Sequence, residues 1–113
     1  MTAKALQTTT EPPAHLSPAA QDWWRAVLKD FAPEGHHLRI LQLAAEAWDR
    51  TQSARESLEA NGLVYIDRFD QPKPRPEAAI ARDNSALFAR LLRELGLDIV
   101  PKDTRLQRQK GRY

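Results

Sequence analysis

What this 113-residue sequence lacks already excludes several classes of protein. It contains no cysteine, which excludes disulfide bonds and thiolate zinc sites. Its four glycines are not clustered, so it has no glycine-rich loop of the kind that binds nucleotide phosphates. No apolar run approaches the roughly 18 residues that span a bilayer, and residues Met1 to Thr10 lack the apolar centre of a signal peptide. We therefore expect one cytoplasmic domain that does not enter the membrane.

The sequence does not space its His, Asp or Glu residues in a pattern typical of a catalytic or metal-binding site. His36 and His37 are consecutive, so on a helix they point in different directions, and no further His or carboxylate completes a tetrahedral site. Asp67, Asp70 and Asp83 are carboxylates, but the first two flank a proline-rich segment. The sequence therefore predicts no catalytic residues, no metal site and no cofactor.

The formal net charge of +2 is distributed unevenly. Between Lys102 and Tyr113 there are five basic residues and one acid, and removing them from the totals of 17 basic and 15 acidic residues leaves 12 and 14. A basic tail on a slightly acidic body predicts a polyanion or an acidic protein surface as partner, although such a tail can also serve only to keep a protein soluble. The candidate phosphate-binding or docking residues are Lys102, Arg105, Arg108, Lys110 and Arg112, with Arg25 and Lys29 as second choice.

The amino-terminal part predicts an arm followed by a helix. Residues 1–16 are rich in Thr, Pro and Ala and lack any period, which is typical of a flexible arm. Ser17 and Pro18 then form a helix start, because serine caps the N–H groups and proline suits the first helical position. The helix should end near Pro33, with one apolar face made of Trp24, Val27, Leu28 and Phe31.

A long second helix is predicted from Gly35 or His36 to Ala60, where Asn61-Gly62 stops it. Its apolar residues form a heptad-like seam, widened in the first half by Leu41, Ala45 and Trp48. Its mixed charges, Asp49, Arg50, Arg55, Glu56 and Glu59, predict a solvated face. About 24 residues span roughly 36 Å, more than one short helix covers. We therefore expect a subunit interface at Trp23, Ile40, Ala44, Ala47, Trp48, Ala54 and Leu58, with packing inside the subunit as the alternative for Trp23.

The remaining part predicts a short β-like segment and a third helix. Leu63 to Ile66 favours a strand, and the three prolines that follow restrict it to an irregular hairpin or an extended loop. Pro76 starts a helix that Gly96 ends, with an apolar face made of Ile80, Leu87, Phe88, Leu91, Leu92 and Leu95. The predicted fold class is all-α: three main helices with a long central helix and a short proline-rich β-like loop. The helical domain covers residues 17–97, and the basic tail covers 98–113.

These elements occur in an order that resembles a known family. The opening Pro12-Pro13-Ala14-His15-Leu16-Ser17, the following Trp23-Trp24-Arg25 and the closing Arg93-Glu94-Leu95-Gly96-Leu97 flank a long helix that ends in Asn-Gly. This pattern resembles the small terminase subunit of tailed bacteriophages, in particular the lambdoid-type and prophage members. The resemblance covers about Pro12 to Leu97.

The resemblance implies a helical, non-enzymatic protein in the host bacterial cytoplasm. Such subunits assemble as a homo-oligomeric ring, recognise viral double-stranded DNA when packaging starts, and pass it to a large subunit that carries the ATPase and the nuclease. The sequence departs from many relatives after Leu97, where Asp98-Ile99-Val100-Pro101 intervenes, so we carry over no specific tail function. The alternatives are a small dimeric DNA-binding regulator of the repressor or antitoxin type and an interaction module whose tail binds a protein.

Overall fold

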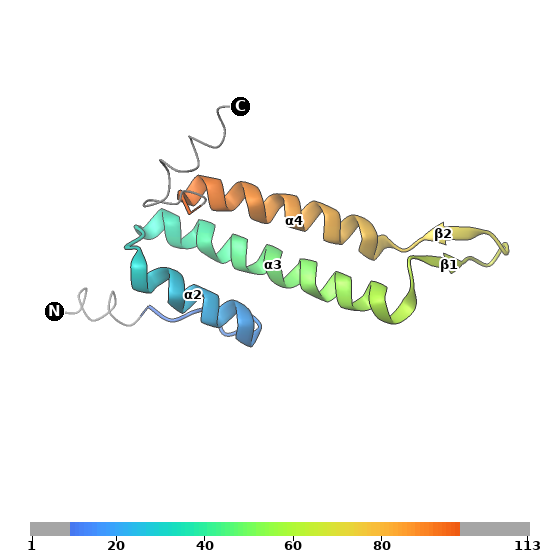
Figure 1. Ribbon diagram of the computed structural model, residues 1–113, viewed down its shortest axis with the longest axis horizontal. Helices are drawn as coiled ribbons and strands as arrows, with labels where there is room; N and C mark the ends of the chain where they lie inside the picture. The colour runs from blue at the N-terminus through green and yellow to red at the C-terminus, as the bar shows by residue number, and fades with distance from the viewer. Residues whose placement is uncertain (1–9, 98–113) are drawn as a thin grey trace, which may run out of the picture.

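The computed structural model describes residues 10–97, which form three helices and one β-hairpin (Figure 1). Helices α3 and α4 run antiparallel side by side, α2 lies along the first half of α3, and the hairpin projects beyond the far end of the helix pair (Figure 1). The elements are α2 (Pro18–Asp30), α3 (Gly35–Asn61), β1 (Val64–Ile66), β2 (Pro72–Pro74) and α4 (Pro76–Leu95). The predicted helical fold with a long central helix and a β-like segment is confirmed.

Local signals in the sequence set the helix ends. The Ser17 Oγ accepts a hydrogen bond from the Ala20 N–H at 3.1 Å, which satisfies one of the N–H groups that a helix start leaves unpaired. Pro18 occupies the first turn, as expected. Gly62 ends α3 with φ 86°, and Gly96 ends α4 with φ 77°. Both angles lie in the left-handed region, where residues other than glycine are strained, so these two stops follow directly from residue type.

The main apolar cluster lies between α2 and the first half of α3. Leu16, Ala20 and Trp24 from the amino-terminal side pack with Leu41 and Ala45 of α3. Leu41 and Ala45 are both fully buried, at 0 % exposure. The widening of the α3 seam that the sequence predicted is therefore confirmed, and α2 covers it.

The small residues of the α3 seam are also buried inside the subunit. Ala44 and Ala47 are 0 % exposed and Ala54 is 4 % exposed, and α4 runs beside α3 over this length (Figure 1). The expectation that these alanines face a neighbouring subunit is wrong. Their small side chains allow α4 of the same chain to approach closely, and α4 covers more of α3 than the sequence suggested.

The amino-terminal segment from residue 10 to residue 16 is packed against the helices. Pro12 is buried, Leu16 is 4 % exposed, and the His15 Nε2 lies 2.7 Å from the Glu46 Oε2. The prediction of a flexible arm therefore does not hold for residues 10–16, because Leu16 belongs to the core. Residues 1–9 lie outside the described range.

Candidate interaction surfaces

The described residues do not form a metal-binding cluster. In the range 10–97, no three His, Cys, Asp or Glu side chains lie where they could hold a metal ion. The rings of His36 and His37 lie next to each other, with centroids 4.1 Å apart and their planes tilted by 43°. None of the helices between residues 10 and 97 is long and apolar enough to cross a membrane.

The predicted DNA-binding residues fall into two groups. The five basic residues of the tail lie outside the described range, so their predicted role stays a prediction. Arg25 lies on α2 with about half of its side chain exposed, and it pairs with Asp22 at 3.4 Å and with Glu11 at 3.8 Å. Lys29 is exposed in the last turn of the same helix. The acidic partners of Arg25 reduce the positive potential that it presents, so Lys29 is the more available cation of the two.

The two half-buried tryptophans of the predicted interface border one apolar pocket. Trp23 packs on Phe88 of α4 with ring centroids 5.6 Å apart, so α2 and α4 touch directly. Together with Trp48 and two alanines they line a pocket of about 220 Å³. Ile40 and Leu58 are also only partly buried. These four residues, unlike the three alanines, keep apolar surface that a second subunit can cover.

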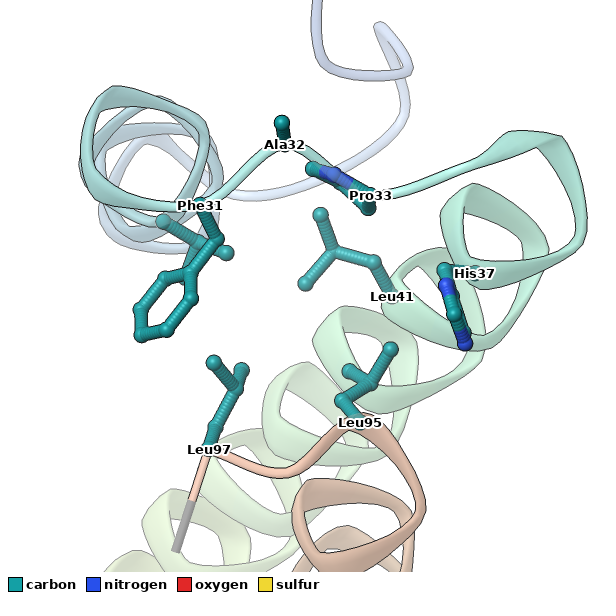
Figure 2. A pocket seen from close by; sticks show the side chains of 8 residues that line it. Phe31, Ala32, Pro33, His37, Leu41, Leu95 and Leu97 are labelled. Atoms are coloured by element: carbon teal, nitrogen blue, oxygen red, sulfur yellow. The ribbon is translucent and has the colours of Figure 1, made fainter. Parts of the chain in front are cut away.

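A second apolar pocket, of about 170 Å³, lies where the turn between α2 and α3 meets the end of α4. Figure 2 shows that Phe31, Leu41 and Leu97 converge on this space, with Pro33 above them and His37 at the side. Phe31 was predicted to extend the buried face of α2, but it is 47 % exposed. The helix ends at Asp30, so the backbone of Phe31 is extended and its side chain leaves the helical face.

A polar contact that the sequence did not indicate attaches the start of α2 to the middle of α3. The Asp49 carboxylate accepts hydrogen bonds from the Ser17 N–H at 2.8 Å and from the Ser17 Oγ–H at 2.6 Å. One turn earlier, the Gln42 amide donates to the Glu46 carboxylate, which also contacts His15, and these bonds lower the pKa of Glu46. Asp49 was assigned to a solvated face. The sequence did not predict that Asp49 binds Ser17, because the two residues lie 32 positions apart.

The β-hairpin carries most of the large apolar side chains that the described residues expose. Leu63, Val64, Ile66 and Phe69 are each more than half exposed, and Tyr65 is 38 % exposed. The Arg68 and Arg75 guanidinium groups lie 5.1 Å and 5.9 Å from the ring centroids of Phe69 and Tyr65 respectively. Ile80, which was predicted to face the core from α4, is also exposed at 41 %.

A comparison with protein families assigns the chain. A family model described as "Phage terminase, small subunit" matches residues 20–111, which include most of α2, all of α3 and α4, and the basic tail as far as Gly111. The chain belongs to this family. Neither a search of curated proteins nor a search of solved structures found a match.

Small terminase subunits are generally non-enzymatic adaptors for DNA recognition, and this small terminase subunit is accordingly not an enzyme. Two features gain meaning from the assignment. The match reaches Gly111, so it includes four of the five basic residues of the tail. The family implies genome packaging with phage DNA and a large terminase subunit. The half-buried tryptophans and the exposed hairpin are therefore candidate contact surfaces.

Proposed function

We propose that this small terminase subunit recognises viral double-stranded DNA when packaging starts and regulates the large terminase subunit, the motor and nuclease. It acts as a homo-oligomeric ring in the host bacterial cytoplasm. The family match over residues 20–111 is the observation that carries the proposal.

The DNA contacts of this proposal are mainly to phosphates. The basic tail supplies five cations between Lys102 and Tyr113, and Lys29 and then Arg25 supply further positive charge from α2. The three helices within residues 10–97 include no short helix pair shaped like a separate helix-turn-helix. Phosphate contacts position a protein without reading sequence, so the tail would strengthen binding on all DNA sequences alike.

The ring of this proposal is held by the apolar surface that the subunit leaves uncovered. Trp23, Ile40, Trp48 and Leu58 are partly exposed on α2 and α3. Burying a large apolar side chain stabilises an interface by about 1.5–3 kcal/mol, so a few of them per contact would be sufficient. A heterologous contact that closes on itself produces a ring rather than a dimer.

Truncation after Val100, followed by two measurements, tests the proposed role of the tail. We expect the truncated chain to bind DNA more weakly at every sequence tested. Its log–log salt slope should also become less negative by about 4 to 5, because each phosphate contact contributes roughly −0.9 to the slope on duplex DNA. The number of subunits measured by light scattering should stay the same, since α2, α3 and α4 all lie upstream of the cut.

The second measurement separates DNA binding from docking on the motor. If the truncated chain binds DNA as the full chain does but no longer changes the ATPase rate of the cognate large subunit, the tail binds the motor and the phosphate assignment is wrong. A length-matched control, with all five basic residues changed to Gln in the full-length chain, shows whether charge or chain length is responsible.

A further inference from the structure

The outer edge of β1 has unpaired backbone groups. The Asp67 N–H donates to the Gln71 carbonyl and the Arg75 N–H donates to the Leu63 carbonyl, both at 2.9 Å, so these two residue pairs are hydrogen-bonded across the hairpin. Bonded and non-bonded pairs alternate in an antiparallel ladder. The N–H and C=O groups of Val64 and Ile66 therefore point away from β2. In the part of the chain that the structure describes, β1 pairs with β2 alone.

The opposite edge of the hairpin is blocked. Pro74 lies across from Val64 and Pro72 across from Ile66, at the positions whose N–H would point outward from β2. Proline has no N–H, so this edge offers carbonyl groups but no donors at these positions. Only the β1 edge can accept a full additional strand.

The two faces of the hairpin differ in chemistry. Side chains alternate between faces along a strand, so Val64 and Ile66 share one face with Pro72 and Pro74, and this face is wholly apolar. The other face carries Tyr65 and Lys73, which are directly opposite each other. The Arg75 guanidinium lies over the Tyr65 ring, and its Nε is buried with no hydrogen-bond partner among the described residues.

We propose that the β1 edge binds an extended peptide of a partner protein by strand addition, and that the peptide alternates apolar and acidic residues. Its apolar side chains would extend the face of Val64 and Ile66. Its acidic side chains would lie beside Tyr65, within reach of the Lys73 and Arg75 cations. Asp67 does not neutralise this site fully, because its Oδ1 accepts the Phe69 and Gln71 N–H groups within the turn.

The added strand also relieves a weakness of the hairpin. A two-stranded hairpin is marginally stable alone, and a third strand strengthens it. Both strands are exposed along their whole length, and the hairpin extends away from the helices (Figure 1). The site goes beyond the proposed packaging role and does not rest on DNA binding, so a failure of one leaves the other untouched.

Fluorescence anisotropy of labelled, capped octapeptides with the full-length chain tests this site. The probe alternates valine and glutamate; one control has the same residues in two blocks, and another alternates valine and lysine. We expect the alternating acidic peptide to bind at least about tenfold more tightly than either control. Only this peptide can form backbone hydrogen bonds with β1 while its valines contact the apolar face and its glutamates lie near the cations. Lys73→Glu should reverse the preference between the glutamate and lysine probes.

Backbone methylation of the probe tests strand addition without altering the protein. Methyl groups on the backbone N atoms of all valines remove the N–H donors along one edge of the peptide. Methyl groups on the backbone N atoms of all glutamates remove the donors along the other edge. We expect one of these peptides to lose binding and the other to keep it; loss with methylated valines indicates an antiparallel peptide, and loss with methylated glutamates a parallel one.

Ile66→Pro provides the matching change in the protein, with Ile66→Thr as the control that keeps the N–H. The proposal is overturned if both methylated peptides bind equally or if the block peptide binds as well as the alternating one. It is also overturned if no peptide binds while Ile66→Pro changes the light-scattering mass, because the edge then joins two copies of this chain.

Discussion

At the scale of single residues, Ser17 does two things at once. Its Oγ accepts the Ala20 N–H at the start of α2 and donates to the Asp49 carboxylate of α3 at 2.6 Å, while its own N–H donates to the same carboxylate. The hydroxyl therefore begins the helix and attaches it to its neighbour. The Pro-Pro-x-x-Leu-Ser motif that precedes Trp24 therefore starts α2 and attaches it to α3 through its serine.

Ser17→Ala should lower the free energy of unfolding by about 1–3 kcal/mol. The change removes a helix cap, worth about 1 kcal/mol, and a hydrogen bond to a charged group. Urea denaturation measures the effect, and Ser17→Thr, which keeps the hydroxyl, should recover most of it. An unchanged midpoint for Ser17→Ala would contradict a stabilising role for this contact.

The contacts of Glu46 make the free energy of unfolding depend on pH in the acidic range. The hydrogen bond from Gln42, followed by the contact with His15, lowers the pKa of Glu46 below its ordinary value of 4.5. A carboxyl whose pKa is lower in the folded state adds stability above its unfolded pKa and loses it as the pH falls through the folded pKa. Wild-type protein should therefore lose stability as the pH falls below 4.5.

Glu46→Gln should lose less stability than wild type over the same acidic interval, since the amide does not titrate. Urea midpoints at neutral pH and at successively lower pH values measure both proteins. Glu77, whose pKa is also lowered, chiefly by its own backbone N–H and then by Ser57, is present in both and cancels in the comparison. Parallel pH profiles would show that the Glu46 contacts do not hold in solution.

At the scale of elements, α3 has two different covered faces. Leu41 and Ala45 face the cluster that contains Trp24, whereas Thr51 and Ala54 lie in the second half of the helix, which α4 accompanies along its length (Figure 1). Small residues on that side determine how closely the two helices approach. Thr51 satisfies its hydroxyl locally by donating to the Ala47 carbonyl at 2.9 Å.

Ala47→Leu should destabilise the subunit by about 1–3 kcal/mol, because the added carbons have no space between the helices. Leu43→Ala is the matched control: Leu43 is 51 % exposed on the same helix, so its truncation should change stability little. Thermal unfolding measures both. If Ala47→Leu instead left the unfolding temperature unchanged and altered only the oligomer mass, α3 would present this face to another subunit.

At the scale of the whole molecule, the helices bury little of the hairpin and leave the tryptophan pocket open. Light scattering should show a closed oligomer larger than a dimer at micromolar concentration, held by the partly exposed Trp23 and Trp48. Trp48→Ala should shift the oligomer toward smaller species on dilution, because the lost indole surface contributes on the order of 1.5–3 kcal/mol per contact. A monomer at the same concentration would contradict the proposed ring.

The sequence by itself determined where α2 and α4 begin and where α3 and α4 end. Ser17, Pro18 and Pro76 start helices, and Gly62 and Gly96 end them, because each acts through its own backbone angles or through hydrogen bonds within one turn. The apolar period likewise predicted the face formed by Leu41 and Ala45. These are local properties, and local properties can be deduced from neighbours in the chain.

Only the tertiary structure decided which surfaces remain uncovered. Whether Ala47 faces α4 or a second subunit depends on the path of a helix that begins about thirty residues later, and the role of Asp49 depends on Ser17, 32 residues away. The open edge of β1 follows from its register with β2, since a shift by one residue would turn Val64 and Ile66 inward. Pairing between distant segments, and not residue type, sets these features, because the same amphipathic pattern permits several partners.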